Sequence, residues 1–120
     1  MRLFEHQAKE LFATVGIPVP KGRLLKSAAD LDEALDEIGL PCVLKAQVLA
    51  GGRGKAGLIQ FANSPAEAAE KAQMLFAAPG ASKLLVEEAL QIKQELYLAI
   101  AVDPGAGAPL VIASSQGGVD

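Results

Sequence analysis

Four glycines and two cations lie close together at residues 51–57, Gly-Gly-Arg-Gly-Lys-Ala-Gly, between two apolar runs. Glycine lets a backbone take positive φ and lets its amide groups approach a ligand closely. Arg53 and Lys55 add positive charge where those amides point, and this combination suits a polyanion such as a nucleotide triphosphate. We therefore predict that this glycine loop covers the phosphates of ATP.

Lys45 closes the apolar run 41–44, just before the glycine loop. A lysine within a strand usually points to solvent. If Lys45 instead points inward, its desolvated ammonium requires an anion, and the α- and β-phosphates of a nucleotide would satisfy it. The inward orientation is the one that a phosphate-binding loop requires.

Three carboxylates stand at strand ends, where Glu87 and Glu88 close one apolar run and Glu95 opens the next. Carboxylates in such places are commonly only solvated, and their spacing alone favours that interpretation. In the functional alternative, Glu87 accepts hydrogen bonds from an adenine amino group. Glu95 would then hold a ribose hydroxyl or pair with Lys45.

The glycine loop also matches two other motifs and a structure without a ligand. Residues 52–57 fit G-x-G-x-x-G, but a dinucleotide fold needs a helix there, and 58–61 has the pattern of a strand. A P-loop is excluded because Ala56 follows Lys55 where a hydroxyl should help to hold magnesium. A glycine-rich hairpin that binds nothing stays open.

The other reactive side chains give no catalytic or metal site. His6 has no cysteine, aspartate or second histidine at ligand spacing, so we expect an ordinary surface residue on the polar side of a helix. Cys42, the single cysteine, lies among apolar residues and is expected to be an inert core thiol. No residue is predicted to be a metal ligand.

Hydrophobic periodicity and helix-start signals place these residues on alternating helices and strands. An α/β (α+β) fold follows, with a mixed or antiparallel sheet and flanking helices. Helices are expected over 4–15, 27–38 and 64–77, and strands over 23–25, 43–49, 58–61, 84–86, 95–102 and 110–113.

Bulk properties narrow the class of protein. The 120 residues fit one domain or part of one, and the open last hairpin predicts that a larger protein is only partly represented. A net charge of −3 without a basic run argues against nucleic acid as a partner. No apolar stretch or leader indicates a membrane or secretion, and one cysteine favours a reducing, cytoplasmic setting.

Seven segments, occurring in one order over the whole chain, resemble the N-terminal part of the β subunit of ADP-forming succinyl-CoA synthetase, which carries an ATP-grasp domain. The glycine loop and the opening Glu-His-Gln-Ala-Lys-Glu-Leu together are the most specific of them. The segments are residues 3–9, 16–20, 43–48, 50–57, 85–88, 95–98 and 115–120.

The resemblance implies the N-terminal lobe of an ATP-grasp domain over Lys21 to about Glu88, and the start of a second lobe from about Glu95 to Asp120. It implies a ligase that uses ATP, with GTP as the alternative, to phosphorylate a histidine of a partner α subunit. The phosphoryl group passes to succinate, and coenzyme A then displaces it. The family's Mg²⁺ ligands would lie beyond Asp120, so this part alone is expected to be inactive.

The family's nucleotide-binding residues carry over only where the motifs match. Lys45, Gly52, Arg53 and Gly54 match the phosphate contacts. Glu87 matches the acid on the adenine side, Leu90 the residue whose backbone helps to hold the base, and Glu95 the acid near the ribose or phosphates. Pro20 fits the form that prefers ATP.

Two points leave the function open in detail. The connector at 77–83 is shorter than in many family members, which indicates a divergent branch and leaves the acid substrate open. Related enzymes such as malate–CoA ligase and ATP-citrate lyase are the nearest alternatives, and a noncatalytic nucleotide-binding module is an alternative of another class.

Overall fold

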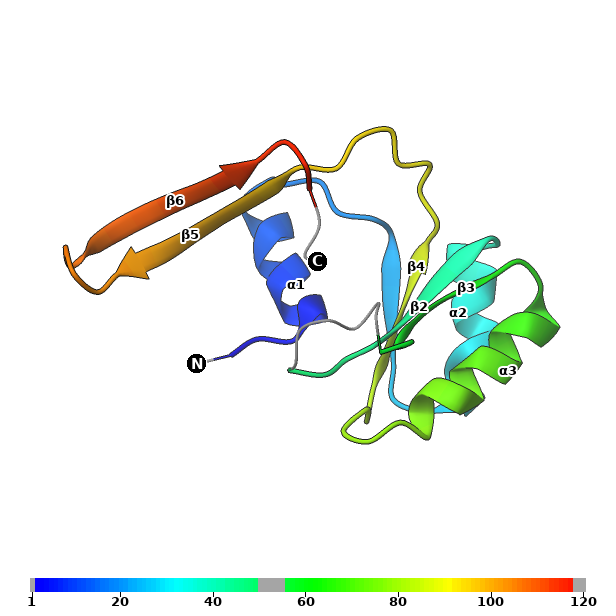
Figure 1. Cartoon of the computed structure of the whole chain (residues 1–120). Coiled ribbons are helices and arrows are strands. Elements are labelled where there is room, and N and C mark those ends of the chain that lie inside the picture. The colour runs from blue at the N-terminus through cyan, green and yellow to red at the C-terminus, as the bar shows by residue number, and fades with distance from the viewer. Residues whose placement is uncertain (1, 50–55, 118–120) are drawn as a thin grey trace. The chain divides into compact units, whose positions relative to one another are not determined.

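The computed structural model describes residues 2–49 and 56–117, and it divides the chain into two compact units, Met1–Leu90 and Gln91–Asp120. Each unit has its own sheet (Figure 1). Neither described range contains a helix with the length and apolar character that crossing a bilayer requires.

A four-stranded sheet forms the centre of the first unit. Its strands run in the order β1-β4-β2-β3, and each is antiparallel to its neighbours. This is the antiparallel sheet with flanking helices that the sequence pattern predicts. The strands are β1 (Gly22–Leu25), β2 (Cys42–Ala46), β3 (Ile59–Ala62) and β4 (Leu84–Glu88).

Local capping signals fix the two helices that cover one face of this sheet (Figure 1). Helix α3 (Pro65–Phe76) begins after Ser64, whose Oγ accepts a hydrogen bond of 3.1 Å from the Glu67 amide. Helix α2 (Leu31–Ile38) follows a short 3₁₀ turn and ends at Gly39 with φ +85°. A side chain at Gly39 would be strained, so glycine is the natural residue for this helix end.

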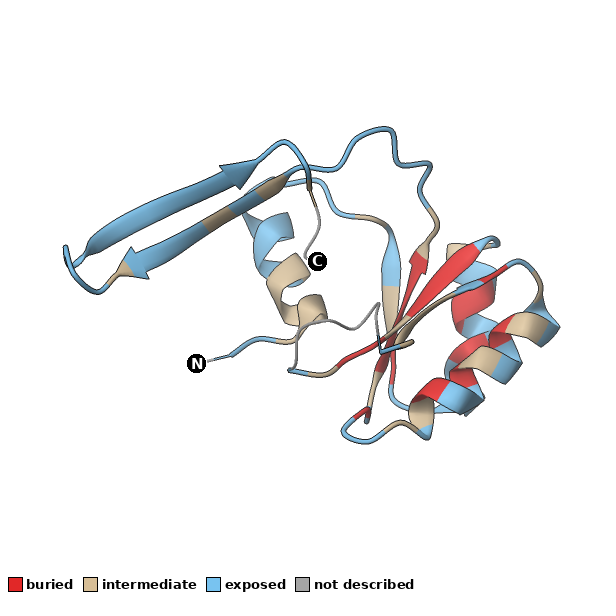
Figure 2. Ribbon diagram, in the orientation of Figure 1, coloured by how far each residue is buried: buried red, intermediate tan, exposed pale blue. Residues whose placement is uncertain are grey.

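The hydrophobic core lies between the sheet and α2 and α3. Along β2, alternate residues Cys42, Leu44 and Ala46 are fully buried on the helix side. Figure 2 shows the buried residues gathered in the sheet and on the inner sides of the two helices. The expectation that Cys42 is a core thiol is confirmed.

Helix α1 (Glu5–Thr14) lies over the opposite face of the sheet (Figure 1). An apolar stripe in the sequence predicted this helix. The apolar residues Leu11, Phe12 and Val15 are nevertheless exposed, and α1 has no buried residue. The side of α1 that contacts the sheet is instead the charged one, carrying Glu5 and Lys9. The sequence pattern predicted the helix correctly but does not indicate which side faces the protein.

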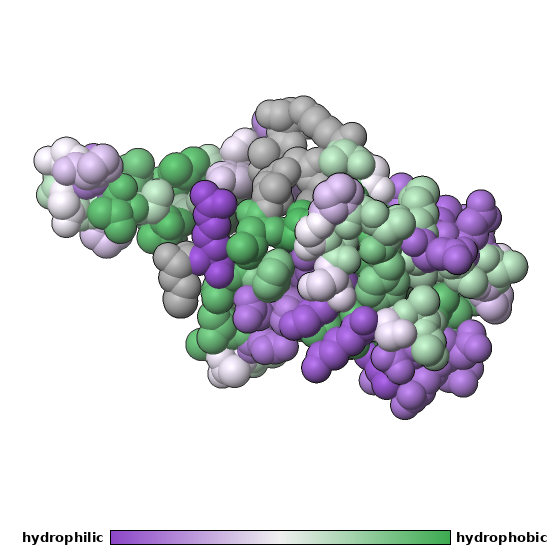
Figure 3. Space-filling model, turned by 90° about the horizontal axis from the view of Figure 1, so that it is seen from below, coloured by the Kyte–Doolittle hydropathy of each residue, from purple (hydrophilic) through white to green (hydrophobic). Residues whose placement is uncertain are grey.

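The second unit is a hairpin of β5 (Tyr97–Asp103) and β6 (Ala108–Ser114). Its first strand begins two residues later than the pattern predicted. Its large apolar side chains lie on both faces, with the three of β5 and Val111 on one face and Leu110 and Ile112 on the other. They stay exposed: Figure 2 shows the hairpin mostly exposed, and Figure 3 shows apolar surface along it. They are Leu98, Ile100 and Val102 on β5, and Leu110, Val111 and Ile112 on β6.

Candidate functional site

The candidate site lies on the sheet face that α2 and α3 leave uncovered. Because side chains alternate along a strand, Lys45 points to this face from β2 and Glu87 points to it from β4. In the register of the two strands, Lys45 is opposite Leu85 and Glu87 is opposite Val43. Lys45 and Glu87 are thus diagonal neighbours, within reach of each other for long side chains.

Two residues of α1 complete a closed ring of four charged groups, which we call the charge quartet: Glu5, Lys9, Lys45 and Glu87. Lys45 Nζ lies 2.7 Å from Glu87 Oε1 and 2.9 Å from Glu5 Oε1. Lys9 Nζ lies 3.0 Å from the same Glu5 oxygen and also pairs with Glu87 Oε2. The quartet joins the helix to the sheet through ion pairs.

Two groups of the quartet, Glu5 and Lys45, hold their charges despite their burial. Glu87 is only 2% exposed, and the Lys45 side chain is 20% exposed. Burial by itself would raise the pKa of Glu5, but hydrogen bonds and attraction from Lys45 and Lys9 lower it from 4.5 to about 2. Burial would lower the pKa of Lys45, and its bonds to Glu87 and Glu5 raise it above the ordinary value of 10.5. Glu5 and Lys45 are therefore ionised at neutral pH.

Gln47 joins α1 to the sheet beside the quartet. Its side chain is 1% exposed; its Oε1 accepts a hydrogen bond of 3.0 Å from the His6 backbone amide. Its Nε2 donates to the Lys45 carbonyl oxygen at 3.1 Å. The amide of Gln47 thus fixes the start of α1 against the strand that carries Lys45.

The expectation that His6 is an ordinary surface residue is wrong. Its side chain is only 11% exposed, and both ring nitrogens are shielded from solvent without a hydrogen-bond partner among the described residues. Nδ1 lies 3.5 Å from Glu10 Oε1, and the ring stacks on Phe4 with centroids 5.9 Å apart. This prediction failed for the same reason that the apolar residues of α1 are exposed: the helix turns its polar side to the sheet.

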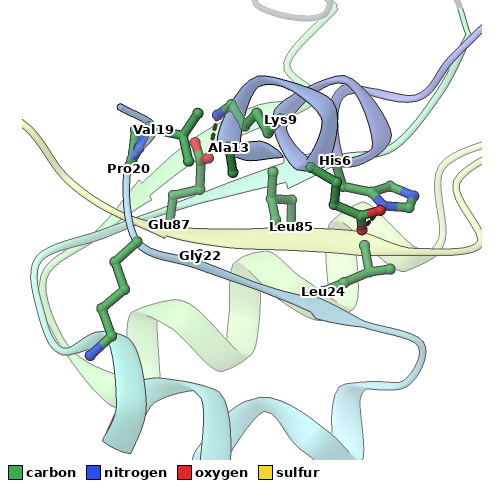
Figure 4. Close-up of a pocket in the computed structure, with 11 residues that line it drawn as sticks. His6, Lys9, Ala13, Val19, Pro20, Gly22, Leu24, Leu85 and Glu87 are labelled. Carbon is green, nitrogen blue, oxygen red and sulfur yellow. Dashed lines mark hydrogen bonds and ion pairs between the residues drawn. The ribbon is translucent and has the colours of Figure 1, made fainter. Parts of the chain in front are cut away.

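A cavity of about 370 Å³ opens between α1 and the strands β1 and β4, next to the quartet. Figure 4 shows Lys9 and Ala13 of the helix above it, with Leu85 and Glu87 below. Pro20, which the family resemblance connects with the choice of nucleotide, is also in its wall. The cavity thus combines apolar walls with the buried charges that can orient a ligand.

The structure brings together some of the predicted site residues. Lys45 points inward and lies beside Glu87, whereas Leu90 is exposed at the end of the first unit. Glu95 belongs to the second unit. Gly52, Arg53 and Gly54 lie outside the described residues, so the predicted phosphate contacts of the loop stay a prediction.

The segments on either side of the glycine loop are both strands. β2 precedes the loop and β3 follows it, with Lys45 paired to Ile59 in antiparallel register. Helix α3 begins only at Pro65. A dinucleotide-binding loop would open directly into a helix, so that alternative is wrong.

Glu5, Lys9 and Gln47 are the residues of this site that the sequence did not single out for a role. Glu5 and Lys9 have the i, i+4 spacing of a helical ion pair, which was a usable signal. Nothing in the local sequence indicates that the pair faces a sheet. Within the described ranges, no three His, Cys, Asp or Glu side chains form a group that could hold a metal ion.

The strands β2 and β3 on either side of the glycine segment, and the inward Lys45 on β2, are what the predicted ATP-grasp domain requires. Residues 2–120 match the ATP-grasp domain. The chain belongs to the ATP-grasp domain family, as the sequence resemblance predicted.

Curated proteins with similar sequences narrow the comparison within this family. The chain is 49% identical to ADP-forming sulfoacetate-CoA ligase subunit SauC of Bilophila wadsworthia and 44% identical to the β subunit of ADP-forming succinate–CoA ligase of Haloarcula marismortui. Both matches cover the whole chain but only 32% of the relative, so the chain spans about a third of their length. It resembles the start of subunits of ADP-forming CoA ligases.

A solved structure shares the fold. Dinucleotide-forming acetyl-coenzyme A synthetase 1 of Ca. Korarchaeum cryptofilum, in complex with coenzyme A, Ca-AMPCP and HgCl⁺, matches with a TM-score of 0.77 and 28% identity. The match covers 93% of this chain and 52% of the other. The α/β architecture predicted from the sequence is thus that of an ATP-grasp protein.

Proposed function

We propose that residues 1–120 are the nucleotide-binding start of the β subunit of an ADP-forming acid–CoA ligase. The observation that carries this proposal is the inward Lys45 ammonium of β2, the strand that precedes the glycine loop in the sequence, held 2.7 Å from Glu87. An inward lysine at the end of a strand can bind phosphate as a point charge. The whole enzyme would use ATP, or GTP as the alternative, to activate the acid for coenzyme A.

Each predicted nucleotide contact keeps its proposed role. Lys45, Gly52, Arg53 and Gly54 would hold phosphates, Leu90 the base through its backbone, and Glu95 the ribose or a phosphate. Glu87 is bonded to two ammonium groups. A carboxylate has about four lone-pair sites, so Glu87 retains acceptor capacity for an adenine amino group while it holds Lys45.

The acid is proposed to be a small dianion. One relative of this chain acts on succinate, and another with higher identity acts on sulfoacetate, according to their names. Both acids carry two negative charges at neutral pH. Succinate is the first candidate from the sequence resemblance, and the 49% identity to the sulfoacetate ligase subunit makes sulfoacetate the second.

The remaining parts of the machinery are also proposals. The two compact units would contribute to the two lobes of the ATP-grasp domain. An α subunit would supply the phosphorylated histidine, and the protein would work in the cytoplasm. Mg²⁺ is the expected ion for the phosphates, and its ligands are proposed to lie beyond Asp120, since the described residues contain no group of three His, Cys, Asp or Glu side chains that could hold it.

ATP binding to wild type and to Lys45→Met tests the proposal directly. A hydrogen bond to a charged group contributes about 1.5–3 kcal/mol, so Lys45→Met should raise the ATP dissociation constant roughly 10- to 100-fold. Lys26→Met is the matched control, because it removes the same charge from an exposed lysine. Circular dichroism would verify that both variants fold, and equal ATP affinity in all three proteins would refute the phosphate role of Lys45.

Turnover then separates the ligase from a noncatalytic nucleotide-binding module. The whole β subunit of which these residues are proposed to be the start, supplied with an α subunit, ATP, Mg²⁺ and coenzyme A, should release ADP over many turnovers only when succinate or sulfoacetate is added; without the acid, at most one ADP per phosphorylated histidine is expected. Binding of ATP without acid-dependent ADP release would support the noncatalytic module. Comparing the two acids at equal concentration would identify the substrate.

A further inference from the structure

Glu5 is the first residue of α1, and the family resemblance assigns no nucleotide contact to it. Its Oε1 nevertheless lies 2.9 Å from Lys45 Nζ and 3.0 Å from Lys9 Nζ. Its side chain is 17% exposed. Glu5 is therefore a mostly buried carboxylate in direct contact with the proposed phosphate ligand.

Within residues 2–49 and 56–117, the contacts of Lys45 Nζ occupy two of its donors and leave one for a ligand. An ammonium group has three N–H donors. Glu87 Oε1 and Glu5 Oε1 lie within hydrogen-bond distance of Lys45 Nζ, and they come from β4 and α1 respectively. Two acceptors on different elements restrict the flexible lysine stem, so the third N–H has a fixed direction before a ligand arrives.

We propose that Glu5 is a positioning residue, which together with Glu87 fixes the Lys45 ammonium so that its remaining N–H points to a nucleotide phosphate. Helix α1 thereby becomes part of the nucleotide site through its contact with Lys45. The phosphate part of this inference rests on the proposed function, whereas the fixing of Lys45 does not.

Charge and position predict opposite results when Glu5 is neutralised. The quartet has two carboxylates and two ammonium groups, so its net charge is zero, and Glu5→Gln makes it +1. If Glu5 acted only through its charge, the variant would bind a polyphosphate more tightly. If Glu5 positions Lys45, the variant binds more weakly.

A pair of variants separates the length of the side chain from its charge. Glu5→Gln keeps the length and loses the charge, whereas Glu5→Asp keeps the charge and is one methylene too short to hold both lysines. We expect both to raise the ATP dissociation constant about three- to tenfold, measured by NMR titration of the chain with ATP in about 0.5 M KCl. At that salt concentration the long-range effect of charge is screened. Glu70→Gln, at an exposed position of α3, is the control and should bind ATP like wild type.

The Lys45 ammonium can also be observed directly, with the lysine side chains labelled with ¹⁵N. A doubly held ammonium exchanges its protons slowly, so wild type and Glu70→Gln should show a Lys45 signal that both Glu5 variants lose. Tighter ATP binding by Glu5→Gln, unchanged binding by Glu5→Asp, or a Lys45 signal that persists in both would overturn the proposal. If wild type binds no ATP, the proposed function fails, and the Lys45 signal still decides whether Glu5 fixes that side chain.

Discussion

Neutralising Glu5 should lower the free energy of unfolding by an amount that depends on pH. The pKa of Glu5 is about 2 in the folded chain, against 4.5 as the ordinary value. A lowered pKa means that the ionised carboxylate stabilises the folded state, fully above pH 4.5 and progressively less as the pH falls through 2. The full shift corresponds to about 3 kcal/mol of unfolding free energy, and partial solvent screening reduces it to about 2 kcal/mol.

Urea denaturation of wild type and Glu5→Gln at several pH values measures this contribution. At pH 7 the variant should be about 2 kcal/mol less stable, and at pH 3 only about 1 kcal/mol less stable, because Glu5 of the wild type is then partly neutral in the unfolded chain. Subtracting one protein from the other cancels the carboxylates that both share. A difference that stays constant from pH 7 to pH 3 would refute the assignment of the lowered pKa to the quartet.

Two further predictions concern the core of the first unit. Leu44→Ala should lower the free energy of unfolding by about 3 kcal/mol, because Leu44 is fully buried between the sheet and the helices; a loss below about 1 kcal/mol in urea denaturation would contradict this packing. The Cys42 thiol is fully buried and burial raises its pKa, so iodoacetamide should label it slowly in the native chain and rapidly in urea. Equal rates would show that the thiol is accessible.

Much of the local structure followed from the sequence because its causes are local. Ser64 and Pro65 predicted the start of α3, and Gly39 predicted the end of α2. The inward Lys45 was one of two orientations that the sequence left open, and a glycine loop with a strand on each side favoured it. Such features depend on a few consecutive residues, so one sequence can reveal them.

The quartet itself depends on contacts between distant parts of the chain. Glu5 and Lys45 are 40 residues apart, and Lys9 and Glu87 are 78 residues apart. Their meeting depends on the strand order β1-β4-β2-β3 and on which side of α1 faces the sheet. The apolar stripe of α1 suggested the opposite side, and no local signal corrected this.

The alternation along β2 sets a strict limit on how this chain can change in length. Cys42, Leu44 and Ala46 serve the core, and Lys45 between them serves the opposite face. Inserting or deleting a single residue within the strand would move each later side chain to the other face of the sheet. The Lys45 ammonium would then point into the core against the helices, and Leu44 toward the nucleotide side. Gains or losses of two codons preserve this parity, so we expect evolutionary length variation to accumulate in the connecting segments instead.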